Sequence, residues 1–508
     1  MSTMGLRQIL RMPLASLASF APVRVFLLTG ENAPVDPELL NLRDDLILLD
    51  SPRSATVLLI AGALSESLFE PAKHIHDQMA HPRCTVWWVN ADTSSAENGQ
   101  TLSLVPDPLI VSVNTSVLPA SVSDESDDES DGLRNTETNA KSNANTNDAL
   151  VALVSALKRT QYELVTGTRA SELDICPDVD PAPWRGVGPY AQGGTGMTGG
   201  VPYGRPLTER APDRDSLELD QLPLRVGPFF HSFPQGFVLD VELQGDIVQS
   251  ALVSAGPVMR LPAMFAMALV KPVPIVVIER ERARSHLHWL SHALRAHGLT
   301  SLARRTLRLS LELSSGHASM TDCAGELRII ARGVERSQVL WWSTRGVGVM
   351  RAPTVVTALG PIARASGICD DARIDEPSYR ALGFEPITQS VATSAAGGDS
   401  SARWRQRIAE VAQSLDLAER ARGARAWGSS VVEGTRGRTT QTEQPETRLY
   451  ALLPDLLQGL EWSDAVTAIV SLDLGEGGKV RRVLPWAAKN KAAEAPGAMN
   501  MGQMDHGM

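Results

Sequence analysis

The stretch ERERARSHLHWLSHAL, residues 279–294, has the spacing of an amphipathic helix that packs into a core. One apolar stripe recurs at intervals of three and four residues and consists of Ala283, Leu287, Leu290 and Leu294. The polar side chains away from that stripe include Arg280, Arg284, His288 and Arg295. We therefore predict a helix over 279–297 that is buried along one side.

A strand and a second helix flank this segment. Residues 237–243 (FVLDVEL) alternate between apolar and polar side chains, as a half-buried strand does, and Gly245–Asp246 follows as a turn. Residues 262–278 are apolar but contain one lysine and two internal prolines, so we predict buried strand or core there. Residues 403–422 predict a helix with Ile408, Val411 and Leu415 along one side.

The first part of the chain has a different pattern. Short apolar runs bounded by turn residues predict strands at 23–28, 46–49, 57–61 and 84–89. Residues 66–80 (ESLFEPAKHIHDQMA) have a helical pattern and lie between the last two runs. Alternation of strands and helices favours a parallel α/β sheet.

Composition marks a boundary after this sheet. Six acidic residues lie between Asp124 and Asp131, and Asn, Thr and Ser follow, so we predict a disordered linker over 111–148. A helix is expected at 149–166. Residues 186–204 are rich in glycine and contain a formal GxGxxG, but the strand and helix that a nucleotide-binding loop requires are missing. A chain-reversing loop that packs against a partner is the alternative.

Bulk composition excludes several functions. The 508 residues suffice for two or three domains, and a net charge of −10 argues against nucleic-acid binding. No two of the four cysteines lie close in sequence, which favours reduced thiols over a disulfide framework; they are Cys84, Cys176, Cys323 and Cys369. No apolar run is long enough to span a membrane. Residues 1–21 contain arginine and serine but no acid, which is typical of a targeting segment or of a short amphipathic helix.

Several blocks of the second half resemble the large core protein that respiratory complex I shares with membrane-bound nickel–iron hydrogenases. Residues 222–248 resemble the family's opening β-hairpin, in which a GPxHPxxHG loop joins two strands. Residues 279–294 are similar to the core helix written ELxRIxSHLxWLG, and GPIARASGICDDARIDEPSYRALGF (360–384) to the GPxxRASGxxxDxRxxxPY segment. Residues 452–474 resemble the family's C-terminal end.

Residues 51–89 (SPRSATVLLIAGALSESLFEPAKHIHDQMAHPRCTVWWV) resemble the small core protein of the same assemblies. The resemblance implies a fused chain that contains both core subunits, with a flavodoxin-like α/β domain followed by an α+β, mostly helical domain that starts with a β-hairpin region. The expected parts are a small-subunit-like domain (1–110), the linker (111–148), a helix and Gly-rich connection (149–221), a large-subunit-like domain (222–484) and a flexible Met/Gly-rich tail (485–508).

The ligands that such subunits use for metals are missing. In the family the small subunit holds a four-iron cluster through a CxGC-type loop after its first strand. Here residues 29–39 (TGENAPVDPEL) and 87–92 (WWVNAD) contain no cysteine, and Glu31 and Asp36 are hard oxygen donors that replace thiolates poorly. The two CxxC pairs of the hydrogenases are also absent. We therefore expect no cofactor to be bound by this chain itself, with quinone as a possible ligand.

The resemblance implies a candidate quinone cavity. In the loop GPFFHSFPQG, His231 lies near the family's first histidine and Gln235 stands at the second, where it can hydrogen-bond a quinone but cannot deliver a proton. The candidate lining residues are His231, Gln235, Arg282, His286 and His292. The alternative for His286 and His292 is an ordinary pair of helix histidines with hydrogen-bonded neighbours.

Two further groups are candidates. Arg364, Asp370, Asp371 and Arg373 in the RASG block predict a polar network at the contact between the two subunit-like domains, or else a structural turn with paired charges. The tail contains thioether and imidazole groups that suit copper(I), although such ends are commonly just solvated; these are Met501, Met504, His506 and Met508.

Together these features predict a non-redox coupling or structural subunit of a complex I-like (NADH–quinone oxidoreductase-like) membrane assembly. The resemblance implies antiporter-like membrane subunits as partners and a peripheral position on the cytoplasmic side of the membrane. One alternative is a quinone-interacting oxidoreductase subunit that receives electrons from a separate iron–sulfur or flavin partner. Another is a soluble pseudoenzyme without membrane partners.

Overall fold

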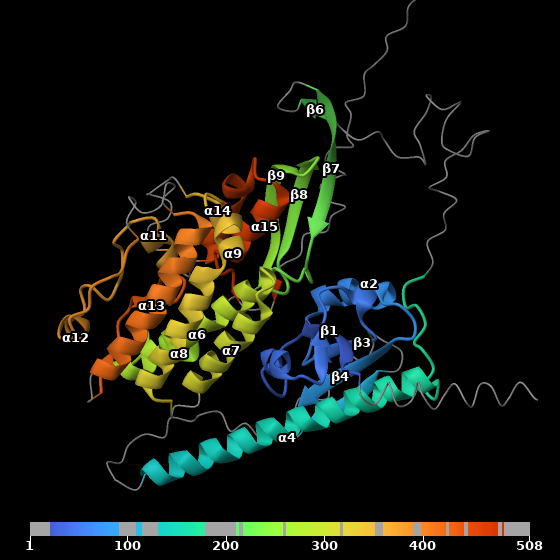
Figure 1. Cartoon of the computed structure of the whole chain (residues 1–508), viewed down its shortest axis with the longest axis horizontal. Helices are drawn as coiled ribbons and strands as arrows, with labels where there is room; N and C mark the ends of the chain where they lie inside the picture. Colours follow the sequence, from blue (N-terminus) through green and yellow to red (C-terminus); the bar gives the residue numbers. More distant parts are fainter. Residues whose placement is uncertain are drawn as a thin grey trace, which may run out of the picture.

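The computed structural model describes residues 21–90, 108–113, 131–177, 210–212, 217–257, 261–314, 318–350, 359–389, 398–422, 426–440, 446–475 and 480–481. It combines a parallel sheet, an antiparallel sheet and a layer of helices (Figure 1). Helices account for 47% of the structure, so the mixed α/β character predicted from the sequence is confirmed.

The first domain is built on a five-stranded parallel sheet. Its strands are β1 (Val23–Thr29), β2 (Leu46–Leu48), β3 (Val57–Ala61), β4 (Cys84–Asn90) and β5 (Leu109–Val113). They are arranged in the order β2-β1-β3-β4-β5, and every neighbouring pair is parallel. The short helix η1 (Pro37–Leu42) follows β1, and α2 (Phe69–Gln78) follows β3.

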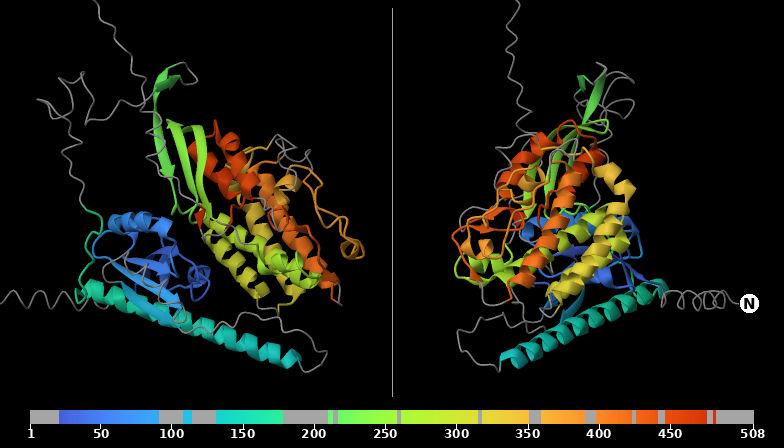
Figure 2. Two further views of the ribbon diagram at one scale, coloured as in Figure 1. Left: turned by 180° about the vertical axis from the view of Figure 1, so that it is seen from behind. Right: turned by 60° about the vertical axis from the view of Figure 1, so that its left-hand side comes forward.

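Both faces of this sheet are covered, which explains why its strands are continuous apolar runs rather than alternating ones. All five residues of β3 are buried. Val57, Leu59 and Trp88 pack on one side with the apolar stripe of α4 (Asp131–Thr166), whereas Leu58 and Trp87 pack on the other with α2. Figures 1 and 2 show α4 running along the underside of the sheet.

Helix α4 corrects the predicted linker. We predicted disorder over 111–148, but β5 extends to Val113 and α4 begins at Asp131; residues 114–130 lie outside the described ranges. Asn, Ser and Thr are weak helix formers, and therefore local composition argued against a helix. Burial of Leu153, Leu157 and neighbouring apolar residues against the sheet anchors the C-terminal half of α4.

The second domain begins with an antiparallel sheet. β7 (Glu218–Val226), β8 (Val238–Gln244) and β9 (Ile247–Pro257) form two successive hairpins, with β6 (Arg210–Pro212) and β14 (Val480–Arg481) at the edges. The turn predicted at Gly245–Asp246 joins β8 to β9, and Gly245 has a φ of +60°, which favours glycine. The predicted opening hairpin is therefore present as β7 and β8.

A layer of helices packs beside this sheet (Figure 1). Its long members are α6 (Ile275–Ala296), α7 (Thr300–Ser314), α8 (Met320–Arg336) and α13 (Ser400–Arg420), with α9 (Gln338–Thr344), α14 (Glu446–Leu457) and α15 (Trp462–Val470) around them. Shorter elements are α5 (Ala263–Ala268), β10 (Val273–Pro274), α11 (Pro361–Ala365), α12 (Pro377–Arg380), β11 (Ala426–Trp427), β12 (Val432–Glu433) and β13 (Arg438–Thr439). The helices predicted at 279–297 and 403–422 are confirmed as α6 and α13.

The apolar run 262–278 contributes to the core, as one of the two predicted alternatives has it, but it is not a single buried strand; Phe265, Val273 and Ile278 are buried. It forms α5, the two-residue strand β10 and the first turn of α6. Prolines are tolerated where a helix begins because the first N–H groups have no partner inside the helix, and Pro274 is the N-cap of α6.

Three predicted features lie outside the described residues: the N-terminal segment, the glycine-rich loop at 186–204 and the tail at 485–508 with its Met/His group. Within the described ranges, no helix combines the length and the apolar character that crossing a bilayer requires.

The packing of α4 on the sheet can be tested by truncating one side chain. Leu157 is fully buried, so Leu157→Ala should lower the free energy of unfolding by about 2–5 kcal/mol through lost burial and a cavity. Val151→Ala on the same helix, where 46% of the residue is exposed, is the matched control and should cost well under about 1 kcal/mol. Urea unfolding followed by circular dichroism measures both, and equal losses would contradict this packing.

Candidate functional site

A cavity of about 320 Å³ lies where the two domains meet. Its wall combines the carboxyl end of β1 with the loop at 229–235, one face of α6 and residues 473–475. The loop contributes Phe229, Phe230 and Phe233, and Phe230 and Phe233 have ring centroids 4.8 Å apart. The volume and the aromatic lining are in the range of small-molecule sites.

The loop between β7 and β8 is fixed to the first domain by Gln235. The backbone N–H and the Oγ1 hydroxyl of Thr29 each donate to Gln235 Oε1 at 2.7 Å, and Gln235 Nε2 donates to the Thr29 carbonyl at 2.6 Å. The side-chain amide of Gln235 is therefore engaged in a contact between the domains.

A second contact between the domains involves the segment around η1. Arg295 Nη1 donates to Asn41 Oδ1 at 2.8 Å, and Arg304 Nε donates to the Asn41 carbonyl at 2.8 Å. Arg304 also pairs with Asp44 at 2.8 Å. The cavity thus lies between two sets of contacts that hold the domains together.

The structure brings only part of the predicted quinone site to this cavity. His231, Gln235 and His292 line it, whereas Arg282 and His286 are fully buried elsewhere in the second domain. His292 Nε2 lies 3.4 Å from the Ser232 carbonyl. Burial, helped by the positive charge of Arg295 and opposed by Glu38, lowers the pKa of His292 to about 4. His292 is therefore uncharged at neutral pH.

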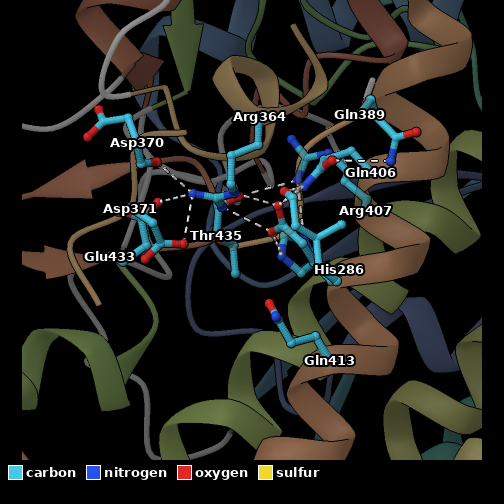
Figure 3. Close-up of polar contacts among 12 residues, drawn as sticks. His286, Arg364, Asp370, Asp371, Gln389, Gln406, Arg407, Gln413, Glu433 and Thr435 are labelled. Atoms are coloured by element: carbon cyan, nitrogen blue, oxygen red, sulfur yellow. Dashed lines mark hydrogen bonds and ion pairs between the residues drawn. The ribbon is translucent and has the colours of Figure 1, made fainter. Parts of the chain in front are cut away.

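A buried charge network occupies the interior of the second domain (Figure 3). Arg364 on α11 is its centre: Nε and Nη2 donate to the two oxygens of Glu410 at 2.8 and 3.1 Å, and Nη1 donates to Glu433 Oε1 at 2.9 Å. Asp371 Oδ2 lies 3.0 Å from the same nitrogen. The network comprises Glu279, Arg282, His286, Arg364, Asp371, Arg373, Arg407, Glu410, Glu433 and Asp473.

Glu279 on α6 is a second centre of this network. It receives hydrogen bonds from Tyr379 Oη at 2.7 Å and Ser414 Oγ at 2.8 Å, and it lies 3.3 Å from both Arg282 and Arg373. Burial alone would raise the pKa of this carboxyl group, but the two guanidinium groups and the two hydroxyls outweigh that effect and hold the pKa below its usual value. Glu279 is accordingly ionised.

The network reaches the cavity at Asp473. Arg407 Nη1 pairs with Asp473 Oδ2 at 3.2 Å, and Arg436 Nη2 pairs with Asp473 Oδ1 at 3.1 Å. Asp473 and Arg436 also line the cavity. A group bound there would therefore contact one end of a series of buried polar contacts.

His286 lies inside this series. Arg407 Nη1 donates to His286 Nδ1 at 3.3 Å, and His286 Nε2 lies 3.3 Å from Glu410 Oε2. Burial lowers the pKa of His286 to about 4 even though Glu410 acts in the opposite direction. The neutral ring thus joins the Arg407 end of the network to Arg364 through Glu410.

The residues predicted at the contact between the domains lie elsewhere. Arg364 contacts Glu410, Glu433 and Asp371, Arg373 contacts Asp371 and Glu279, and Asp370 pairs with Arg438. These partners all belong to the second domain, so the group binds α6, α11, α13 and β12 to one another. The sequence suggested a network in this block but not its location.

Several buried polar residues of α13 were missed, among them the network members Arg407 and Glu410, although this helix carries a signal for them. Arg403, Arg407, Glu410 and Ser414 repeat at intervals of four, three and four residues, the spacing of a buried helical stripe, and all four are buried. Polar residues that recur at the spacing of a buried helix face indicate that this face packs inside the protein, where the charged groups need partners.

The donor atoms near β1 do not fit an iron–sulfur cluster. The described loop after β1 offers carboxylates such as Glu31 and Asp36, whereas clusters are held by thiolates. Cys84 lies at the amino end of β4, away from this edge, and burial raises the pKa of its thiol to about 12. Cys323 is buried on α8 and Cys369 is exposed beyond α11.

Removing the centre of the network should be costly. Arg364→Met leaves Glu410 and Glu433 buried without their guanidinium partner, which we expect to destabilise the protein by about 3–5 kcal/mol. Arg380→Met is the matched control, because the Arg380 side chain is 63% exposed and its pairing with Asp375 is worth little. Urea unfolding of the full chain measures both variants, and a loss below about 1 kcal/mol for Arg364→Met would contradict the assignment.

His286 should make stability depend on pH. Its folded pKa of about 4 lies below the ordinary histidine value of 6.5, so between these values the unfolded chain binds a proton that the folded chain does not. This contribution is fully present above pH 6.5, is lost as the pH falls to about 4, and amounts to roughly 3 kcal/mol. His286→Gln should flatten the pH dependence of the urea midpoint over this window relative to wild type, and parallel curves would refute the interpretation.

Comparison with known proteins supports a relation to complex I for one region of the chain. Residues 317–453 match the family model described as respiratory-chain NADH dehydrogenase, 49 Kd subunit. A search of curated proteins finds no match. The matched region contains α8, α9, α11, α13 and Glu433 of the network, and it does not extend to the first domain or to α6. For residues 317–453 of the second domain, the match supports a relation to the large-subunit type of complex I-like and hydrogenase-related proteins.

Proposed function

We propose that this chain is a redox-silent subunit of a complex I-like membrane assembly, with a structural or coupling role. In this proposal the first domain corresponds to the small core subunit, and the parallel strand order β2-β1-β3-β4-β5 supports a flavodoxin-like arrangement for it. The partners are antiporter-like membrane subunits, and the chain lies peripherally on the cytoplasmic side of the membrane.

The observation that carries the proposal is the contact between Gln235 and Thr29. Three hydrogen bonds of 2.6–2.7 Å engage the Gln235 amide at the edge of the first sheet where the family would place a cluster-binding loop. An amide cannot exchange protons near neutral pH as imidazole does. In this proposal, Gln235 joins the two domains by hydrogen bonds and does not transfer protons.

The buried charge network supports a coupling role. Asp473 at the cavity pairs with Arg407, and the neutral His286 lies between Arg407 and Glu410. From Glu410, the ion pairs of Arg364, Asp371 and Arg373 lead to Glu279. Buried ion pairs are satisfied in a few distinct arrangements of the helices and not in intermediate ones. Conformational coupling between two sites requires such distinct arrangements. A partner or ligand that displaces Asp473 would act on the whole series.

A second candidate function is a quinone-interacting oxidoreductase subunit that receives electrons from an iron–sulfur or flavin partner. The observation that favours it is the aromatic cavity of about 320 Å³ with the neutral His292 in its wall. A neutral imidazole can donate one hydrogen bond to a quinone carbonyl. Arg282 and His286 take no direct part, because the network buries both of them.

The proposal is tested by isolating the tagged full chain in a gentle detergent and identifying the proteins that accompany it. We expect polytopic antiporter-like subunits, and iron and acid-labile sulfide analysis of the same sample should find no cluster that depends on this chain. Co-purified iron–sulfur or flavin subunits, together with quinone binding that His292→Ala abolishes, would replace the proposal with the second candidate. Recovery of the chain alone from the soluble fraction would overturn both.

A further inference from the structure

One outer surface of the helical layer carries a run of arginines. Arg328, Arg332 and Arg336 recur at four-residue intervals on α8, so they share one face of the helix, and all three are exposed. The opposite face of α8 packs into the core through Leu327, Ile330 and other residues. Figure 2 shows α8 at the outside of the layer.

Helix α9 begins two residues after α8 ends and carries exposed apolar side chains. Val339 and Trp342 are 73% and 78% exposed and stand three residues apart, while Leu340 and Trp341 between them face the core. Arg345 follows three residues after Trp342 and is exposed. We name the group the α8–α9 surface; it consists of Arg328, Arg332, Arg336, Val339, Trp342 and Arg345.

Residues 328–345 contain four exposed arginines and a single acidic residue, Glu335, so this surface is positively charged. Some exposed arginines elsewhere pair with acidic residues, such as Arg420 with Asp416 and Arg422 with Glu419. No ion pair is formed by the four arginines of the α8–α9 surface in the described ranges, and the adjacent Glu335 is engaged by Arg405 at 3.6 Å. Such a local concentration of cations is unusual in a chain with a net charge of −10.

We propose that the α8–α9 surface binds an anionic phospholipid membrane surface. Tryptophan prefers the membrane–water interface, where its ring is buried and its N–H stays hydrated, and guanidinium groups bind lipid phosphates through paired hydrogen bonds. The exposed Trp342 and the four exposed arginines of residues 328–345 supply both components. The inference does not depend on partner subunits and therefore goes beyond the proposed function.

An acidic segment of the chain itself fits the α8–α9 surface less well than a membrane does. Residues 123–131 (SDESDDESD) would match the arginines in charge but contain no apolar side chain to cover Val339 and Trp342. A membrane surface satisfies the charged and the apolar parts together. Each arginine near an anionic surface strengthens binding by about fivefold at physiological salt, and this gain falls as salt rises.

The test is co-sedimentation of the full chain with vesicles of neutral phosphatidylcholine and with vesicles in which about one lipid in three is phosphatidylglycerol. Binding is expected only to the anionic vesicles. Arg332→Ala/Arg336→Ala should weaken it by roughly 25-fold, and Trp342→Ser should weaken it even at low salt. Arg24→Ala/Arg53→Ala, which removes two exposed arginines from the first domain, is the matched control and should bind like wild type.

Equal binding to both vesicle types, or wild-type binding by the α8–α9 variants, would overturn the inference. Absence of vesicle binding would also overturn it; if a synthetic peptide of residues 121–131 then binds the wild type but not Arg332→Ala/Arg336→Ala, the surface belongs to an acidic protein segment. Circular dichroism confirms that the variants are folded. None of these outcomes bears on the subunits recovered with the chain, so the proposed function is tested separately.

Discussion

The second domain depends on the ion pairs of Arg364. This side chain is fully buried and contacts carboxylates from three different segments, namely Asp371, Glu410 and Glu433. Burial of a guanidinium group is expensive unless its charge and its hydrogen bonds are satisfied, and here the carboxylates raise the pKa of Arg364 further above its usual value. Because each partner comes from a separate element, the ion pairs exist only when α11, α13 and β12 are correctly placed.

Close backbone packing makes this arrangement possible. Gly360, with a φ of +54°, precedes α11 and lies against Gly437 in the turn between β12 and β13. A Cβ atom at Gly360 would lie 2.7 Å from the Gly437 Cα, so a larger residue would push Arg364 away from Glu433. The steric limit at Gly360 and the ion pair of Arg364 with Glu433 therefore both require α11 to lie close to β12 and the turn that follows it.

The cavity and the network are two parts of one arrangement, since Asp473 belongs to both. Asp473 adopts a φ of +58°, which is uncommon for a residue with a side chain, and Arg407 and Arg436 hold its carboxylate from two sides. On the other side of the cavity, Gln235 joins the loop to the first domain. The two sides of the cavity are therefore held by hydrogen bonds and ion pairs, which fix its geometry.

The sequence by itself determined many of the elements and the donor atoms that each loop can offer. Apolar runs such as 57–61 and the stripe of 279–297 specify their strand and helix through local periodicity, and a loop without cysteine lacks thiolates in any fold. Tertiary structure alone decided which groups meet. Gln235 and Thr29 are 206 residues apart, and Arg364 and Glu433 are 69 apart, so their contact depends on how whole elements pack. Helix α4 shows the same limit. The composition of its polar first half does not favour a helix, whereas its second half is held in place by burial against the sheet.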